Sequence, residues 1–187
     1  MSNDTTVGSE KFWGVKLREH LSRVVRIPSC GADLRASLGL DPAAAHRAHR
    51  HVALFVPHGR TGGAYERAVY LTSAIAAHHP QLLVYDDRAS IGTLVGLTAP
   101  TADDGSDDAS FARLQSLCRG DSKELARRVP GLVTLCIGRG SHLDLAQLAW
   151  DVSRWDTDRD AVVKRWVRDY SFSRRKAVPE EEDGDVE

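Results

Sequence analysis

Apolar residues recur at helical spacing along most of this chain. Near the start, Trp13, Leu17, Leu21 and Val24 are 4, 4 and 3 residues apart, and Ser9 precedes them as a candidate N-cap. This spacing places the four side chains on one face of a helix of about 15 residues. Because no segment alternates between apolar and polar residues as a half-buried strand would, the pattern predicts an all-α fold.

Further helices are expected before residue 98, each with its own start or stop signal. Gly39 ends one of them, Asp41 and Pro42 supply an N-cap and a first-turn proline for the next, and Pro57 ends it. Residues 64–78 are apolar almost all round, which predicts a central buried helix. The expected helices cover residues 32–38, 42–56 and 64–78, with a short helix after Ser90.

The second half of the chain is strongly helical in pattern. Asp121, Ser141 and Thr157 are expected N-caps, and the stripe around Pro130 keeps one helical phase, which predicts a kinked but continuous helix. The stripes are Phe111, Leu114 and Cys118; Leu125, Val129, Leu132 and Cys136; Leu145, Leu148, Val152 and Trp155; and Val163, Trp166, Val167 and Tyr170.

These helices are expected to form two small packed helical bundles. The Thr-, Ala-, Asp- and Gly-rich residues 98–108 read as an acidic linker between an N-terminal bundle at residues 9–97 and a C-terminal bundle at residues 109–172. Residues 173–187 have no apolar period, and they are predicted to be a disordered acidic C-terminal tail.

The charge of the chain is unevenly distributed. The formal net charge of the 187 residues is -1, but residues 177–187 hold six acids and no base. The other 176 residues carry 25 bases against 20 acids, a net of +5, and four of those acids lie in residues 103–108. The remainder therefore favours a polyanionic partner. An alternative reading is that the 20 arginines, against 5 lysines, only form a solvated surface.

Several function classes find no support in the sequence. No stretch approaches the roughly 20 apolar residues of a membrane span, and the first ten residues lack the pattern of a signal peptide, so a cytoplasmic location and no membrane partner are expected. Cys30, Cys118 and Cys136 are far apart and odd in number, which predicts reduced, buried thiols.

No catalytic, metal or cofactor site is expected either. His46, His49 and His51 spread around a helix instead of converging, and the glycine-rich loop at residues 59–63 lacks the lysine and preceding strand of a phosphate-binding loop. The four aspartates in residues 103–108 lie in a Gly/Ser loop without a rigid support. The chain is therefore not expected to be an enzyme.

Cationic side chains remain as the candidate binding residues. Lys164, Arg165 and Arg168 oppose the apolar face of Trp166 and read as ordinary solvated charges, and each of the other cations could be the same when taken alone. The stronger candidates are Lys16, Arg23, Arg35, Arg113, Arg119, Arg127, Arg128 and Arg139.

Residues 111–172, from FARLQSLCRG to WVRDYSF, carry a series of motifs in a fixed order. They are an arginine-led helix, a D-x-x-x-L-x-R-R helix, an "LD" opening, an L-x-x-D-x-x-x-W helix and a final tryptophan helix. In these features the segment resembles the C-terminal half of a known family, the CasB small subunits of the type I-E CRISPR Cascade complex. Residues 30–57 (CGADLRASLGLDPAAAHRAHRHVALFVP) and 66–80 (ERAVYLTSAIAAHHP) resemble the N-terminal half. From residue 30 to residue 172, the segments span about three quarters of the chain in the family's order.

The resemblance implies a non-catalytic protein without cofactors, present as two copies along the inner face of Cascade. Its partners would be the backbone and large subunits, the CRISPR guide RNA, and the target and displaced DNA strands. Carried over by position, the nucleic-acid-binding residues are Arg35, Arg113, Arg119 and Arg128, and further candidates are Lys16, Arg23, Arg67, Arg127 and Arg139. A stand-alone DNA-binding regulator and a pure assembly scaffold remain as alternatives, although no helix reads as a major-groove recognition helix.

Overall fold

The computed structural model describes residues 5–99 and 107–177, and every regular element in these ranges is helical. This confirms the all-α prediction. The elements in chain order are α1 (Thr5–Val24), α2 (Pro28–Arg35), η1 (Pro42–Ala44), α3 (His46–Val52), η2 (Ala53–Phe55), η3 (His58–Arg60), α4 (Ala64–His78), η4 (Pro80–Val84), α5 (Ile91–Thr98), α6 (Asp107–Arg119), α7 (Ser122–Ile137), α8 (Leu145–Ser153) and α9 (Trp155–Ala177).

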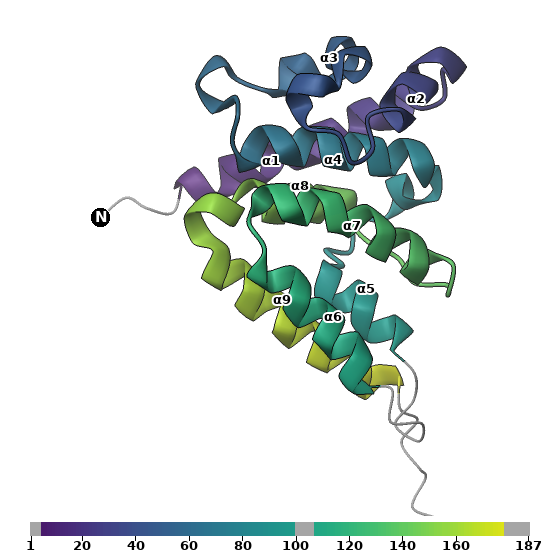
Figure 1. Cartoon of the computed structure of the whole chain (residues 1–187), viewed down its shortest axis with the longest axis vertical. Helices are drawn as coiled ribbons and strands as arrows, with labels where there is room; N and C mark the ends of the chain where they lie inside the picture. Colours follow the sequence, from purple (N-terminus) through teal and green to yellow (C-terminus); the bar gives the residue numbers. More distant parts are fainter. Residues whose placement is uncertain (1–4, 100–106, 178–187) are drawn as a thin grey trace, which may run out of the picture.

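The helices pack in two groups that mix the halves of the chain (Figure 1). In one group, α4 lies at the centre and packs against α2, α7 and α8, while α1 also packs on α8. In the other, α5 packs mainly on α9 and also on α6. Thus α8 joins the N-terminal helices, and α5 joins the C-terminal ones. The bundle limits at residues 9–97 and 109–172 stay a prediction, but the packing crosses the linker between them.

Side-chain caps explain where several helices begin. Asp121 accepts a hydrogen bond from the backbone N–H of Glu124 at 2.7 Å, as predicted, and α7 runs without a break through Pro130. The prediction for α8 is wrong in detail. Asp144 is its N-cap and accepts from the N–H of Ala146 at 2.8 Å, whereas the Ser141 hydroxyl donates to the carbonyl of Leu94 at 3.1 Å.

Two predicted helices have different limits in the structure. The helix expected at residues 32–38 is α2, which begins earlier, at Pro28, because proline is well suited to a first helical turn. The helix expected at residues 42–56 is divided into η1, α3 and η2. Asp41 still caps η1, since its carboxylate accepts from the N–H of Ala43 at 3.2 Å.

The last helix also differs from its prediction. Thr157 does not begin it, because helical residues start at Trp155 and the non-helical backbone falls at Asp158. The tail was predicted to begin at residue 173, but α9 continues to Ala177, and the buried Arg174 donates to the carbonyl of Ala99 at 3.2 Å. Residues 178–187 of the predicted tail, and residues 100–106 of the predicted linker, lie outside the described residues.

Close backbone contact joins α5 to α9. A Cβ atom added at Gly92 would lie 1.9 Å from the carbonyl oxygen of Trp166, and one added at Gly96 would lie 2.8 Å from that of Tyr170. Real Cβ atoms do not approach backbone oxygens so closely, so these two positions require glycine for the observed packing. The pair is four residues apart, which places both glycines on one face of α5.

The three thiols do not share one environment. Only Cys136 is buried, while Cys30 and Cys118 are partly exposed, so the prediction of three buried cysteines holds for one of them. Burial raises the pKa of Cys118 to about 11. All three are free thiols in the structure, as expected.

Candidate nucleic-acid interface

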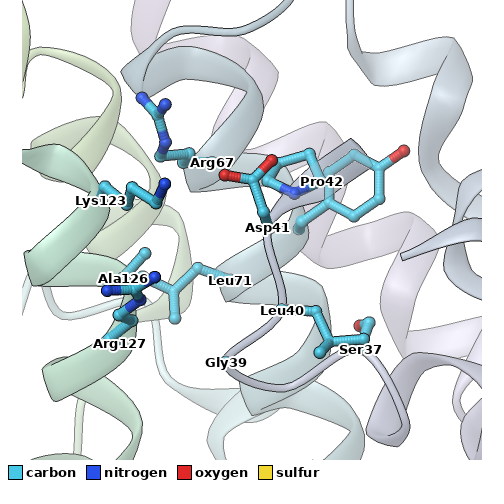
Figure 2. A pocket seen from close by; sticks show the side chains of 11 residues that line it. Ser37, Gly39, Leu40, Asp41, Pro42, Arg67, Leu71, Lys123, Ala126 and Arg127 are labelled. Carbon is cyan, nitrogen blue, oxygen red and sulfur yellow. The ribbon is translucent and has the colours of Figure 1, made fainter. Parts of the chain in front are cut away.

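The first cationic cluster surrounds a small pocket between α4, α7 and the loop that follows Gly39. Arg67, Lys123 and Arg127 line it together with Asp41 and Tyr70 (Figure 2). Its volume is about 30 Å³. A cavity needs about 10–15 Å³ to hold one water molecule, so this pocket has room for the oxygens of a charged group but not for a base or sugar ring.

Arg67 connects the pocket to the start of α7. Its Nη1 donates to the hydroxyl of Ser122 at 3.0 Å, and its Nε is buried without a hydrogen-bond partner. The N–H of Glu124 lowers the pKa of Asp121 most, and the charges of Arg67 and Lys123 lower it further. Arg67 therefore has a structural contact and one unused donor next to the pocket.

Lys123 and Arg127 are four residues apart on α7, so they occupy the same face of the helix. Figure 2 shows both side chains on the α7 side of the pocket, opposite the loop that carries Leu40 and Asp41. Neither side chain has a hydrogen bond or ion pair among the described residues. Because these two cations make no hydrogen bond or ion pair within the described ranges, they are available to bind an anion.

The second cluster lines a groove between α6 and α7. Arg113 and Arg128 flank Leu117, Leu132 and Leu135 in a groove of about 350 Å³. Arg113 is exposed on α6, so this groove combines an apolar floor with exposed cationic rims.

Arg128 is held by two contacts across the groove to α6 and by one contact within α7. Its Nη1 donates to the carbonyl of Ser116 at 3.2 Å and to the Ser116 hydroxyl at 3.0 Å. Its Nη2 lies 3.2 Å from Oε1 of Glu124, and both side chains of this ion pair are about half exposed. Arg128 thus links α6 to α7 and still faces solvent.

The structure places the other predicted binding residues outside these clusters. Lys16 and Arg23 are exposed on α1, and Arg119 is exposed at the end of α6. Arg35 donates to the carbonyl of Ala77 at 3.3 Å and Arg139 to that of Thr98 at 3.4 Å. Because these carbonyls lie in the last turns of α4 and α5, Arg35 and Arg139 cap helix ends in addition to being exposed.

Sequence reasoning missed Lys123 and misjudged Arg165. The spacing of Lys123 from Arg127 could have identified it, since residues four apart on a helix are neighbours. Arg165 was predicted to be an ordinary solvated charge, but it pairs with Asp151, whose side chain is 1% exposed. No sequence pattern links residues fourteen apart on two different helices.

Two of the three histidines considered in the sequence, His49 and His51, have structural partners. The Nδ1 atom of His49 lies within hydrogen-bonding distance of the Tyr70 hydroxyl, and Nε2 of His51 is 3.1 Å from Oδ2 of Asp33. In residues 5–99 and 107–177, no group of three or more His, Cys, Asp or Glu side chains could hold a metal ion. No helix within the described ranges is long and apolar enough to cross a membrane.

Comparison with known proteins identifies the family. Residues 31–170 match the family model of the CRISPR-associated protein Cse2. No curated protein sequence matches the chain.

Solved structures share the fold over nearly the whole chain. A chain of a CRISPR RNA-guided surveillance complex is 28% identical with a TM-score of 0.75, and the match covers 89% of this chain and 95% of that one. A Cse2-family protein from Thermus thermophilus is 25% identical with a TM-score of 0.70, over 85% and 97%. CasB from Thermus thermophilus is 23% identical with a TM-score of 0.70, over the same shares, and shows the common fold.

These matches define a class of all-helical CRISPR-associated proteins. Since the family model covers most of its length, the chain belongs to the Cse2 family. This confirms the predicted resemblance to the CasB small subunits.

Proposed function

We propose that this chain is the non-catalytic small subunit of a type I-E CRISPR Cascade complex, where it binds guide RNA and target DNA backbones and stabilises the R-loop. The observation that carries this proposal is the Cse2 family match over residues 31–170. The 28% identity to a chain of a CRISPR RNA-guided surveillance complex supports it.

The cationic surface supports backbone binding in particular. Arg67, Lys123 and Arg127 surround a pocket that fits phosphate oxygens, and Arg113 and Arg128 flank the groove on the other side of α7. Guanidinium and ammonium groups bind phosphate oxygens without reading the base sequence. In an RNA-guided complex, base pairing reads the sequence, so the protein needs only cationic surface and shape.

The partners follow from this role. They are the guide RNA, the target and displaced DNA strands, the backbone and large subunits, and a second copy of the chain. The exposed Leu135 in the α6–α7 groove and the exposed Val84 of η4, which packs on α1 and α4, are apolar surfaces that suit contacts with protein subunits.

An assembly scaffold without nucleic-acid contacts is the main alternative, and a stand-alone DNA-binding regulator is the other. A scaffold would pair the arginines with acidic partner proteins. A regulator would bind one duplex sequence tightly, with a helix in the major groove.

The test is assembly of the full chain with the other Cascade subunits and a guide RNA, followed by measurement of target DNA binding at several salt concentrations. We expect the chain to co-purify in the complex. The variant Lys123→Ala with Arg127→Ala should assemble normally, but the slope of log K against log salt should be smaller by about two units. Arg26→Ala is the matched control, because Arg26 is exposed and lies in neither cluster.

Failure to assemble would contradict the proposed function. Normal assembly with an unchanged salt slope would favour the scaffold. The isolated chain should bind nucleic acid weakly and without sequence preference, so tight binding to one duplex sequence would favour the regulator.

A further inference from the structure

A larger cleft lies on another side of the molecule, along the contact between α5 and α9. It is lined by Thr93 and Leu97 of α5, by Arg165, Arg168 and Phe172 of α9, and by Arg88 of the loop before α5. Its volume of about 590 Å³ is within the usual range of small-molecule sites, and it is far larger than the pocket beside Arg67. A ring system fits here that the first pocket cannot hold.

One wall of the cleft is apolar and exposed. Phe172 is 56% exposed and Leu97 is 39% exposed. Among the aromatic residues whose burial the structure describes, Phe172 alone is exposed. An exposed phenylalanine ring is an unfavourable surface in water unless another flat or apolar group covers it.

The rim of the cleft is cationic. The guanidinium of Arg88 has no hydrogen bond or ion pair among the described residues, and Arg168 is 63% exposed. The acids that face the cleft already have partners. Asp87 pairs with His142 at 2.5 Å, and Asp169 accepts from the hydroxyl of Ser90 at 2.8 Å and lies 3.3 Å from Arg168.

The backbone of Arg88 is held in an unusual conformation. Its φ of +62° lies in the left-handed region, where a residue with a Cβ atom is strained. Asp144 holds this turn, because its Oδ2 accepts from the N–H of Arg88 at 3.1 Å. The turn therefore fixes Arg88 at the mouth of the cleft, and strained residues of this kind cluster at binding sites.

Arg165 lines the cleft but does not present its Nε to it. The Arg165 side chain forms an ion pair with Asp151, and its Nε is buried without a hydrogen-bond partner. The cations that a ligand in the cleft can reach are therefore Arg88 and Arg168.

We propose that this cleft binds one unstacked nucleotide of a single-stranded nucleic acid. The base lies against Phe172 and Leu97, and the phosphate pairs with Arg88 and Arg168. An aromatic platform beside cations is the usual arrangement for binding single strands without sequence preference. The inference deepens the proposed function, since it assigns a single strand, and not a duplex, to this face.

The test measures binding of the full chain to an oligothymidylate of about 12 nucleotides and to a duplex of the same length, at low salt. Phe172→Ala should weaken single-strand binding roughly 5- to 150-fold, the range for loss of one stacked base, and should change duplex binding far less. Leu54→Ala is the matched control, because Leu54 is 75% exposed and lies outside the cleft. It should leave both affinities unchanged.

Arg88→Ala with Arg168→Ala should also weaken single-strand binding, whereas Arg26→Ala should have a smaller effect. Phe172→Trp serves as a second probe, because a tryptophan that stacks on thymine should lose fluorescence when the oligonucleotide binds. It also retains the ring if Phe172→Ala proves unstable in a thermal melt.

Three results would overturn the inference: no single-strand binding by the wild type, equal loss of single-strand and duplex binding for Phe172→Ala, or no fluorescence change for Phe172→Trp. Loss of Cascade assembly for Phe172→Ala, with unchanged oligonucleotide binding, would assign the cleft to a protein partner. These outcomes are separate from failure of the proposed function, which is measured by assembly of the wild-type chain.

Discussion

Two ion pairs of similar chemistry occupy opposite environments in this molecule. Arg165 pairs with Asp151 where α8 meets α9, and the exposed fractions of the two side chains are 24% and 1%. Arg128 pairs with Glu124 on the outer face of α7, where the fractions are 48% and 47%. The first pair is part of the core, and the second is part of the candidate interface.

The two ion pairs differ in the number of other groups that donate hydrogen bonds to the acid. Besides Arg165, Asp151 accepts from Nε2 of Gln147 at 2.6 Å and from the indole Nε1 of Trp166 at 2.6 Å. Glu124 makes its ion pair in contact with water. An arginine that pairs with a buried carboxylate takes part in the packing of the helices, whereas an exposed one remains available for a ligand.

The largest expected effect is at Asp151. Asp151→Ala leaves the guanidinium of Arg165 and the N–H groups of Gln147 and Trp166 without their acceptor. Removing one partner of a buried ion pair costs about 3 to 5 kcal/mol of unfolding free energy. Urea denaturation followed by circular dichroism measures it.

Glu124→Gln is the matched control for this prediction. It should cost about 1 kcal/mol or less, because the exposed pair is screened by solvent. Similar losses for the two variants would show that burial does not separate these ion pairs.

The second-largest loss of stability is expected at the contact between α5 and α9. Gly92→Ala places a methyl group against the backbone of Trp166, and overpacking of this kind costs about 1 to 3 kcal/mol or more. Gly131→Ala is the control within a helix, since a Cβ atom there meets nothing within 4 Å. It should be neutral or stabilise the protein by up to about 1 kcal/mol. Thermal melts of both variants decide whether the close approach exists in solution.

The same comparison shows what the sequence could and could not predict. The helical spacing located α1, α4 and α7 well, because periodicity depends on residues near one another in the chain. The pattern of polar residues correctly predicted Asp121 as the N-cap of α7, but for α8 it predicted Ser141 where the structure has Asp144. Both residue types are good N-caps, and the sequence does not show which of two nearby ones has the required backbone conformation.

Local sequence patterns could not predict the tertiary packing. The pairing of α8 with α4 and of α5 with α9 joins segments far apart in the chain, so no window of sequence contains it. For the same reason, the sequence could not show that Arg165 is paired with a buried acid, whereas Arg127 lines a pocket and has no ion pair among the residues that the structure describes. The arginines Arg113 and Arg128 were selected through the family resemblance, and the structure places them at one groove.

A smaller effect on stability, but a clear one on binding, is expected from the exposed arginines. Arg113→Ala combined with Arg119→Ala and Arg128→Ala should leave the isolated chain folded, because all three side chains are exposed on α6 and α7. In the assembled complex, the salt slope of target binding should fall by about one unit for each phosphate group that is no longer neutralised. Target affinity should fall alike for all sequences.

Trp166→Ala is the control for loss of folding. Trp166 is fully buried, so its truncation should cost about 3 to 5 kcal/mol and reduce binding only through unfolding. If the triple variant holds target DNA as well as the wild type at every salt concentration, these three arginines do not contact the nucleic acid.

The smallest effect on stability is expected from deletion of residues 178–187. The cut falls after Ala177, the last residue of α9, so the helix retains the buried Arg174 and its bond to Ala99. Only Val178, Pro179 and Val186 are apolar in the deleted segment, which has no helical period to bury, so the thermal midpoint should remain nearly unchanged.

The deletion changes the formal net charge from -1 to +5, because the segment holds six acids and no base. Binding of the isolated chain to single-stranded DNA should therefore strengthen at low salt and converge with the wild type as salt screens the charges. Replacing the six acids with their amides should reproduce this gain if charge is its cause. A large loss of helicity on deletion would instead show that this segment packs against the helices.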